Sequence, residues 1–255
     1  MKYLQKTEGG LQQFLVQTFE ELRDLIENGI VDIGEYVFRG QSNATWKLET
    51  TLDRLIRHAR MTGAKQGALE PFVKAHLDRF RLEIRGRRGD NPSKLAEDDL
   101  WALGQHFGLA TPLLDWSQSP YISVFFALAV ITEPNIERAL WCLHRARVAQ
   151  INKKLSAKER LLLIFPDSDD NKRLLGQSGL FSKGPVMKPL DEWVKQRSQA
   201  SKEAVLLKVV FPGDRTFRKA ALKKLQLMNI NHSTLFPDLF GASLFCNIVS
   251  EAYEV

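Results

Sequence analysis

The sequence is poor in cysteine and contains no long apolar run, and both absences narrow the classes of protein it can belong to. Only two cysteines, Cys142 and Cys246, occur among its 255 residues. Each lies in an apolar, strand-like segment, so we expect two buried free thiols in a reducing compartment rather than a disulfide framework. No apolar run approaches the roughly 18 to 20 residues that span a membrane, and residues 1–10 lack the apolar stretch of a secretory signal peptide. A cytoplasmic protein with no membrane partner is therefore expected.

Sequence motifs for several common chemistries are also missing. There is no Walker-type phosphate loop and no Gly-x-Gly-x-x-Gly dinucleotide fingerprint. The five histidines are scattered and the cysteines isolated, so no metal-ligand spacing is present and we expect no metal. His106, Asp115 and Ser117 have the residue types of a hydrolase triad. However, the Gly-x-Ser-x-Gly elbow is absent and Ser117 lies only two residues after Asp115, which argues against a serine hydrolase.

Positive charge, by contrast, is abundant: 36 Lys and Arg residues against 30 Asp and Glu residues give a formal net charge of +6. Two basic clusters stand out, one with Arg79, Arg81, Arg85, Arg87 and Arg88, and one with Arg215, Arg218, Lys219, Lys223 and Lys224. Two interpretations are open. Each cluster is a solvated basic helix face, or each is a footprint for nucleic acid, whose affinity would then fall steeply with added salt.

Length and composition suit one ordinary globular domain. Hydrophobic residues make up 44% of the chain and charged residues 26%. We expect a single domain over residues 1–255, with a helical extension at 1–30 and a core at 31–250. In the extension, apolar residues recur at helical spacing and predict a helix over residues 14–26.

Beyond this extension, β-branched and apolar runs are mixed with helical periodicity. Strands are predicted over residues 36–39, 112–116, 139–144 and 204–211. Helices are predicted over residues 52–59, 68–84, 95–107, 120–132, 191–197 and 212–225. Residues 151–163 fit either element, and residues 244–249 form a last strand or a helix end. Because strands and helices do not alternate strictly, the sequence predicts an α+β fold in which helices flank a mixed or antiparallel sheet.

One stretch, from Gln105 to Pro120, is unusually dense in polar side chains for its place in the chain. It carries an amide, an imidazole, a carboxylate, an indole and three hydroxyls between two apolar segments. Upstream, the short β-type run from Tyr36 ends on Arg39 and Gly40. We expect these two segments to meet in space and to form one cleft.

Four blocks of the sequence resemble those of the FRG domain family, which is named for a Phe-Arg-Gly motif. The first is Tyr36-Val-Phe-Arg-Gly-Gln41 followed by Trp46-Lys-Leu-Glu-Thr-Thr-Leu-Asp-Arg54; the second runs from Gln105 to Phe126-Ala127; the third is Arg173-Leu-Leu-Gly-Gln-Ser-Gly-Leu-Phe181; and the last is Ser233-Thr-Leu-Phe-Pro-Asp-Leu-Phe-Gly241. The resemblance implies that the whole chain is one FRG domain.

The order of these blocks also resembles that of ADP-ribosyltransferases of the Arg–Ser–Glu type. Arg39-Gly40 would be the first feature, and Ser117-Gln-Ser119 with Phe126-Ala127 the second. The third feature, a catalytic glutamate on a late strand, has no clear match. The resemblance implies NAD as donor substrate, an unknown protein or nucleic-acid acceptor, and a role as a bacterial effector, toxin or phage-defence component. The alternative is a non-catalytic FRG module that binds a ligand or nucleic acid.

Transfer of ADP-ribose spreads positive charge over the ribose, so a carboxylate must lie near it and a guanidinium suits the phosphates. By this hypothesis the catalytic candidates are Arg39, Asp115, Ser117, Ser119 and Asp238, with Glu251 as a further candidate for the acid. The candidates for binding NAD are Arg39, Gly40, Gln41, Trp46, Gln105, His106, Trp116 and Gln177.

Structural interpretations of the same residues are equally open. Arg39 and Asp115 would form an ion pair that clamps two strands, and Gly40 would be a turn glycine. Asp115 and Asp238 would cap a turn or a helix. His106, Trp46 and Trp116 would belong to the core.

Overall fold

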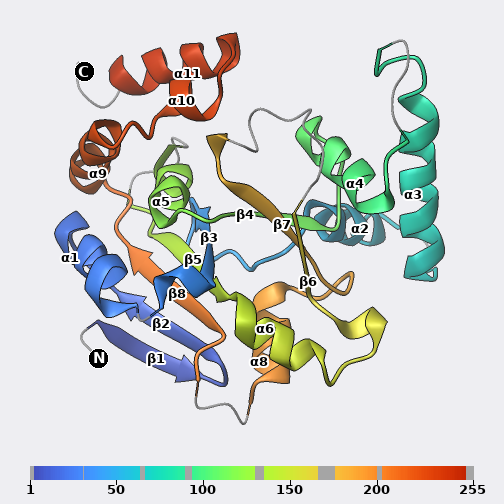
Figure 1. Ribbon diagram of the computed structural model, residues 1–255, viewed down its shortest axis with the longest axis horizontal. Coiled ribbons are helices and arrows are strands. Elements are labelled where there is room, and N and C mark those ends of the chain that lie inside the picture. Colours follow the sequence, from blue (N-terminus) through green and yellow to red (C-terminus); the bar gives the residue numbers. More distant parts are fainter. Residues whose placement is uncertain are drawn as a thin grey trace.

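The computed structural model describes residues 3–30, 32–63, 67–89, 94–129, 135–165, 176–199 and 203–250. These residues form an open sheet of eight strands flanked by helices (Figure 1). The strand order is β1-β2-β8-β5-β3-β4-β7-β6. Strands β2 and β8 run parallel, and the other neighbours in this sheet are antiparallel. The prediction of an α+β fold with a mixed sheet and flanking helices is confirmed.

The middle of the sheet is made of three apolar strands, β3 (Tyr36–Gln41), β5 (Arg138–His144) and β8 (Leu206–Phe211). All of β5 is buried, as its apolar run predicts. Strands β4 (Leu113–Ser117), β7 (Gly179–Lys183) and β6 (Leu162–Ile164) continue the sheet on the far side of β3. The four predicted strands are thus confirmed, with small differences at their ends.

The N-terminal segment does not have the predicted structure. Its first described elements are strands β1 (Leu4–Glu8) and β2 (Leu11–Leu15), and only then follow helix α1 (Phe19–Asp24) and a π-helical turn, η1 (Leu25–Gly29). The expected helical extension at 1–30, with one helix from residue 14, is therefore wrong for its first half. Strand β2 pairs with β8, and the paired residues are about 195 positions apart in the sequence. Because the partner is so distant, this pairing leaves no local pattern in the sequence.

The remaining helices agree with the sequence pattern apart from their ends. Their bounds are α2 Thr51–Met61, α3 Leu69–Glu83, α4 Glu97–His106, α5 Pro120–Ala129, α6 Arg145–Asn152, α8 Leu190–Arg197, α9 Arg215–Leu227, α10 His232–Leu235 and α11 Leu239–Val249, with short 3-10 turns η2 Ile33–Glu35 and η3 Ala157–Glu159. Residues 244–249 thus belong to a helix, and the ambiguous segment 151–163 divides into the end of α6, η3 and the start of β6.

Side chains alternate between the two faces of the sheet along each strand, and helices cover the apolar side chains on both faces. Phe38, Leu140 and Cys142 point to one face, where α1, α5 and α9 to α11 cover them. Trp141 and Leu143 point to the opposite face, which α6 and α8 cover. Helices α2, α3 and α4 gather on the side of the sheet that holds β4, β7 and β6, away from α1 and α9 (Figure 1).

The two cysteines differ, and one expectation about them is wrong. Cys142 is buried in β5, and burial raises the pKa of its thiol. Cys246 is exposed, because it lies on the outer side of α11 rather than in a strand. Both are free thiols. Among the described residues, no helix has the length and apolar character needed to cross a membrane.

Candidate functional site

Arg39 lies at the junction of two cavities. The smaller cavity has a volume of about 260 Å³, and the larger one about 1050 Å³. Arg39, Gly40 and Phe126 line both of them. The smaller cavity is also bordered by Phe38, Asp115, Trp116, Ser117, Ser123, Gln177 and Phe236. The predicted meeting of the Arg-Gly strand with the polar stretch around Asp115 is therefore observed.

Gly40 sets the close contact between strand β3 and helix α5. A Cβ atom at this position would lie 1.8 Å from the carbonyl oxygen of Ser123 and 2.7 Å from the backbone nitrogen of Ala127. Only glycine therefore lets the helix approach the strand so closely. Gly40 lies inside β3, so the interpretation as a turn glycine is wrong.

Arg39 is held on one side by Asp115. Its Nη1 donates to the backbone oxygen of Asp115 at 2.7 Å and lies 3.5 Å from the carboxylate Oδ2. Its Nε is buried and has no hydrogen-bond partner among the described residues. The side chain of Arg39 is 22% exposed and that of Asp115 is 64% exposed. The pair does link β3 to β4, but its side-chain contact is long, and Nη2 has no hydrogen-bond partner among the described residues, so the outer edge of the guanidinium is left for a ligand.

Burial lowers the pKa of the Arg39 guanidinium, while the charge of Asp115 and the hydrogen bond to it raise it. A guanidinium remains protonated in spite of such shifts. The smaller cavity thus contains a permanent positive charge in partly desolvated surroundings, where an anion interacts with it more strongly than in water.

Asp115 is positioned by Gln105, which Thr111 orients in turn. The Nε2 of Gln105 donates to Asp115 Oδ1 at 2.8 Å. Gln105 is itself oriented by Thr111, whose hydroxyl donates to the Gln105 Oε1. Gln105 therefore supports the site through Asp115, because it does not line either cavity.

Ser117 and Ser119 form the connection from β4 to α5. The Ser117 hydroxyl donates to the backbone oxygen of Gln177 at 2.7 Å and accepts from the backbone nitrogen of Ser119 at 3.0 Å. The Ser119 hydroxyl accepts from the backbone nitrogen of Ile122, in the first turn of α5. Ser117 borders the smaller cavity, whereas Ser119 shapes the loop beneath it.

Aromatic rings enclose much of the smaller cavity. Phe38, Trp116, Phe126 and Phe236 all border it, and the rings of Phe126 and Phe236 meet edge to face at 6.0 Å. Trp116 is buried, and its indole Nε1 donates to the Ser182 hydroxyl at 2.8 Å, so it is a core residue that also forms a wall. Walls of this kind suit a flat ring.

The larger cavity has a different character, because charged side chains from the loop after β3 and from α2 line it. Lys47, Arg54 and Arg57 bring positive charge, and Glu49 and Glu192 bring negative charge. Trp46 also lines this cavity and is 54% exposed, so its interpretation as a core residue is wrong. Gln41 is committed to the fold: its Oε1 accepts from Trp141 Nε1 and its Nε2 donates to Lys47 O.

His106 and Asp238, like Gln105 and Ser119, do not line either cavity. His106 is half-buried at the end of α4, where its ring meets Phe107 edge to face at 4.8 Å. Asp238 is the N-cap of α11 and accepts from the backbone nitrogen of Gly241 at 2.9 Å, which is the capping role proposed as its alternative. The last two candidates are Gln177 and Glu251. Gln177 borders the smaller cavity, and its Nε2 donates to the backbone oxygen of Leu235. Glu251 lies outside the described residues.

Several residues of the cleft were not proposed as site residues from the sequence, namely Phe38, Lys47, Arg54, Arg57 and Phe236, and Phe126 entered only through the resemblance. A signal for two of them is present: Arg54 and Arg57 are three residues apart on a helix that opens with a capping box at Thr50 and Asp53. For the aromatic residues the sequence has no such signal, since an aromatic residue at helical spacing is normally part of a core.

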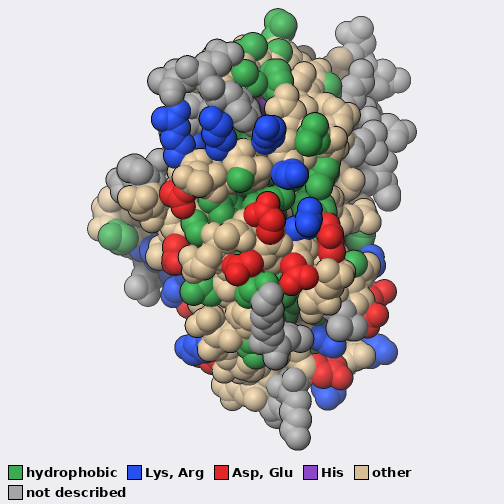
Figure 2. Space-filling view, turned by 90° about the vertical axis from the view of Figure 1, so that its left-hand side faces the viewer, with side chains coloured by type: hydrophobic (Ala, Val, Ile, Leu, Met, Phe, Trp, Pro, Cys, Tyr) green, Lys and Arg blue, Asp and Glu red, His purple; other side chains and the backbone are tan. Residues whose placement is uncertain are grey.

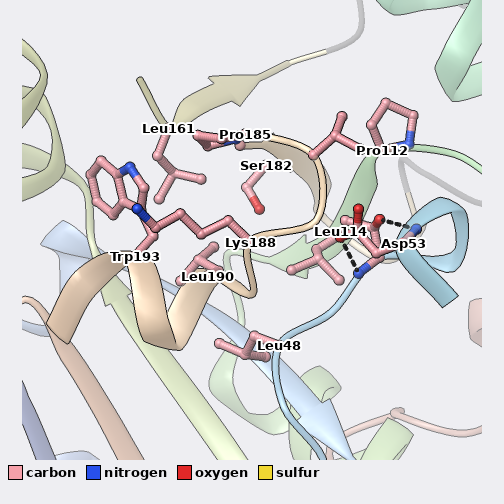
Figure 3. Close-up of a pocket in the computed structure, with 13 residues that line it drawn as sticks. Leu48, Asp53, Pro112, Leu114, Leu161, Ser182, Pro185, Lys188, Leu190 and Trp193 are labelled. Carbon is pink, nitrogen blue, oxygen red and sulfur yellow. Dashed lines mark hydrogen bonds between the residues drawn. The ribbon is translucent and has the colours of Figure 1, made fainter. Parts of the chain in front are cut away.

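A third pocket, drawn in Figure 3, is not suited to a ligand. It lies between Leu48, Asp53, Leu161 and Trp193, and its volume is only about 10 Å³, which is room for no more than about one water molecule. Asp53 is buried, and its two carboxylate oxygens accept from the backbone nitrogens of Met187 and Thr50. This pocket is a packed junction between α2 and the segment that leads to α8.

Some residues of the two basic clusters are buried or paired in the structure. Arg218 is buried, and its Nε donates to the backbone oxygen of Leu128 at 3.1 Å, so it does not belong to a solvated face. Arg81 pairs with Asp78 at 2.5 Å in the other cluster. Figure 2 shows basic side chains in a band over α9 and acidic side chains in a band over α1 beside it. Binding of nucleic acid by either cluster stays a prediction.

Comparison with known proteins gives one match. A model of the family described as FRG domain matches residues 34–135. This segment contains Arg39, Arg54, Asp115 and Ser117, and hence most of the charged residues of the cleft. No curated protein and no solved structure matches the chain.

Proposed function

We propose that the cleft at Arg39 binds NAD or a related dinucleotide and transfers its ADP-ribose group to an acceptor. The observation that carries this proposal is the position of one partly exposed guanidinium between a cavity walled by aromatic rings and a cavity with more cationic than acidic side chains in its wall. A dinucleotide has the same two-part character, a flat ring at one end and charged phosphates beyond it.

The nicotinamide ring suits the smaller cavity. Phe126 and Phe236 offer aromatic surface, and the polar edge formed by Ser123 and Gln177 offers groups for its carboxamide. Arg39 then lies where the ribose and the first phosphate would follow. Because a guanidinium donates several hydrogen bonds from one plane, it suits a phosphate better than a lysine would.

Transfer would break the bond between the ribose C1′ carbon and the nicotinamide nitrogen. The electron pair of this bond leaves with the ring, which becomes neutral nicotinamide, and positive charge develops on the ribose. A carboxylate nearby stabilises that charge, and Asp115 is the acidic residue that borders the smaller cavity among the described residues. An acceptor oxygen or nitrogen then bonds to C1′ and releases its proton to Asp115 or to water.

The second candidate function is binding of the same ligand without transfer. It is favoured by the state of the polar groups: Asp115 already accepts from Gln105 and Arg39, and the Ser117 hydroxyl is engaged on both sides. A carboxylate so held orients its partners but has less freedom to approach a ribose. The two candidates share one site and differ in whether nicotinamide is released.

The experiment is to incubate the protein with NAD and a cell extract, and to measure free nicotinamide by chromatography. Transfer predicts nicotinamide release that falls at least about a hundredfold in Asp115→Asn and in Arg39→Gln, since each removes a charge from the reacting site. Arg60→Gln is the matched control, because Arg60 lies on α2 outside both cavities.

The outcomes separate the two candidates. Release by the wild type and by Arg60→Gln, with loss in the two site variants, supports transfer. No release, together with a rise in melting temperature on adding NAD that Arg39→Gln abolishes, supports the binding module. Neither release nor a shift in melting temperature would contradict both.

A further inference from the structure

The larger cavity contains four cationic side chains, and three of them already have a carboxylate partner. Lys47 pairs with Glu192 at 2.6 Å, Arg57 pairs with Glu49, and Arg39 pairs with Asp115 at 3.5 Å. Arg54 has no carboxylate partner among the described residues. This leaves one guanidinium in the cavity wall whose charge the fold does not balance.

The position of Arg54 follows from the way α2 is anchored. A capping box formed by Thr50 and Asp53 starts the helix, and Leu52 and Ile56 bury one of its faces. Arg54 and Arg57, three residues apart, therefore lie together on the neighbouring face and reach the cavity. The adjacent Asp53 cannot neutralise Arg54 well, since it is buried and its oxygens accept backbone N–H groups.

Arg54 is also held in place while most of its donors stay open. Its Nη1 donates to the backbone oxygen of Glu49 at 3.1 Å, which fixes the side chain without removing its charge. Arg54 is close enough to Arg39 for its charge to act on it: burial is the main cause that lowers the pKa of Arg39, and the repulsion from Arg54 adds to it. Two like charges that face a shared cavity are relieved by an anion between them.

We infer that Arg54, together with Arg39, forms a subsite in the larger cavity for a diphosphate group, such as the pyrophosphate of a nucleotide. This inference rests on the proposed function and names the part of the ligand that the larger cavity recognises. Two guanidinium groups on different elements, β3 and α2, can each donate a pair of hydrogen bonds to different phosphates. The exposed indole of Trp46 in the same wall offers a stacking surface for the base beyond the diphosphate.

The experiment titrates inorganic pyrophosphate, ADP and uncharged adenosine into the wild type, Arg54→Gln and Arg60→Gln by calorimetry. Arg54 is exposed, so its replacement leaves the core of the fold intact, which a melting curve checks. Arg60→Gln removes the same charge from the same helix outside the cavity. The affinities for pyrophosphate and ADP should fall about ten- to hundredfold in Arg54→Gln, as expected for the loss of charge-assisted hydrogen bonds. The affinity for adenosine should change little.

Two results would overturn the subsite: a wild-type protein that binds neither pyrophosphate nor ADP, or an equal loss in Arg54→Gln and Arg60→Gln, which would indicate only general attraction. Failure of the proposed function is distinguishable from both. If ADP binding depends on Arg54 but NAD yields no nicotinamide, the subsite is supported and transfer fails. If Arg54→Gln releases nicotinamide with an unchanged KM for NAD, the subsite is contradicted while transfer is supported.

Discussion

The small pocket at Asp53 and the large cleft at Arg39 show two opposite ways of placing a charged side chain in a cavity wall. Asp53 is 1% exposed, and its two oxygens accept backbone N–H groups in a space of about 10 Å³. Arg39 is 22% exposed, has an unmatched Nε, and adjoins cavities of about 260 Å³ and 1050 Å³. A buried charge whose partners are all supplied by the backbone serves the fold, whereas one with open donors beside an open volume is a candidate for binding.

The largest difference in stability between a structural and a binding residue is expected for two tryptophans. Trp116 is buried at 3% exposure with a bonded indole nitrogen, while Trp46 stands 54% exposed at the larger cavity. Trp116→Ala should lower the free energy of unfolding by about 3–5 kcal/mol because it leaves a cavity in the core. Trp46→Ala should lower it by less than about 1 kcal/mol and weaken nucleotide binding instead. Urea denaturation and NAD titration of both variants measure this, and equal losses of stability would break the contrast.

A second prediction concerns Gly40, where the cleft is built by close packing. In Gly40→Ala, the new Cβ would meet the backbone of α5 at 1.8 Å, so helix and strand must separate. We expect a loss of about 3 kcal/mol in the free energy of unfolding. Gly34→Ala is the matched control, since no atom lies within 4 Å of the corresponding Cβ. A melting temperature of Gly40→Ala equal to that of Gly34→Ala would show that the close approach is unimportant.

A third and smaller difference in stability is expected between variants of Asp53 and Asp115. Asp53→Ala should cost about 2 kcal/mol of stability, because it removes a capping box and leaves the backbone nitrogen of Met187 without an acceptor. Met187 has a left-handed backbone, with φ of 63°, which this bond helps to hold. Asp115→Ala should change stability by no more than about 0.5 kcal/mol, because the residue is exposed. Chemical denaturation of both variants measures the difference; a greater loss in Asp115→Ala would reverse the assignment of roles.

The smallest predicted effect is a pH dependence of stability that ligand binding does not share. Burial lowers the pKa of His232, and burial together with the charge of Arg147 lowers that of His144. The unfolded chain therefore binds protons first, and the free energy of unfolding should fall as the pH drops below about 6.5. The charge of Arg39 does not change in this range.

Denaturation midpoints at several pH values test this prediction. His232→Gln should show a shallower loss of stability below about pH 6.5 than the wild type. An equal or steeper loss in the variant would show that other groups dominate the acid sensitivity.

Much of the fold is predictable because local patterns and tertiary contacts agree. Strand β5 is apolar from Ala139 to Leu143 and is buried throughout. Helix α9 begins where Asp214 offers a cap, as expected from the sequence. The N-terminal strands are the exception, because β2 is specified by pairing with β8 and its apolar residues also fit helical spacing.

The sequence predicts the central pair of charges in the site, but neither its shape nor the further cations of the larger cavity. The sequence indicates that Arg39 and Asp115 meet, and they do. For Ser119 and Asp238 it leaves capping and catalysis both open, because a capping side chain and a catalytic one have the same residue types, and the structure shows the caps. It does not indicate that Trp46 is exposed while Trp116 is buried, since this depends on packing between strands that are distant in sequence.

The central claim, that the open donors of Arg39 bind a dinucleotide, is tested most directly by a calorimetric titration of NAD into the wild type and Arg39→Gln. The account predicts saturable binding to the wild type and an affinity at least about tenfold lower in a variant that remains folded. Equal affinity in the two proteins, or no binding by the wild type, would contradict it.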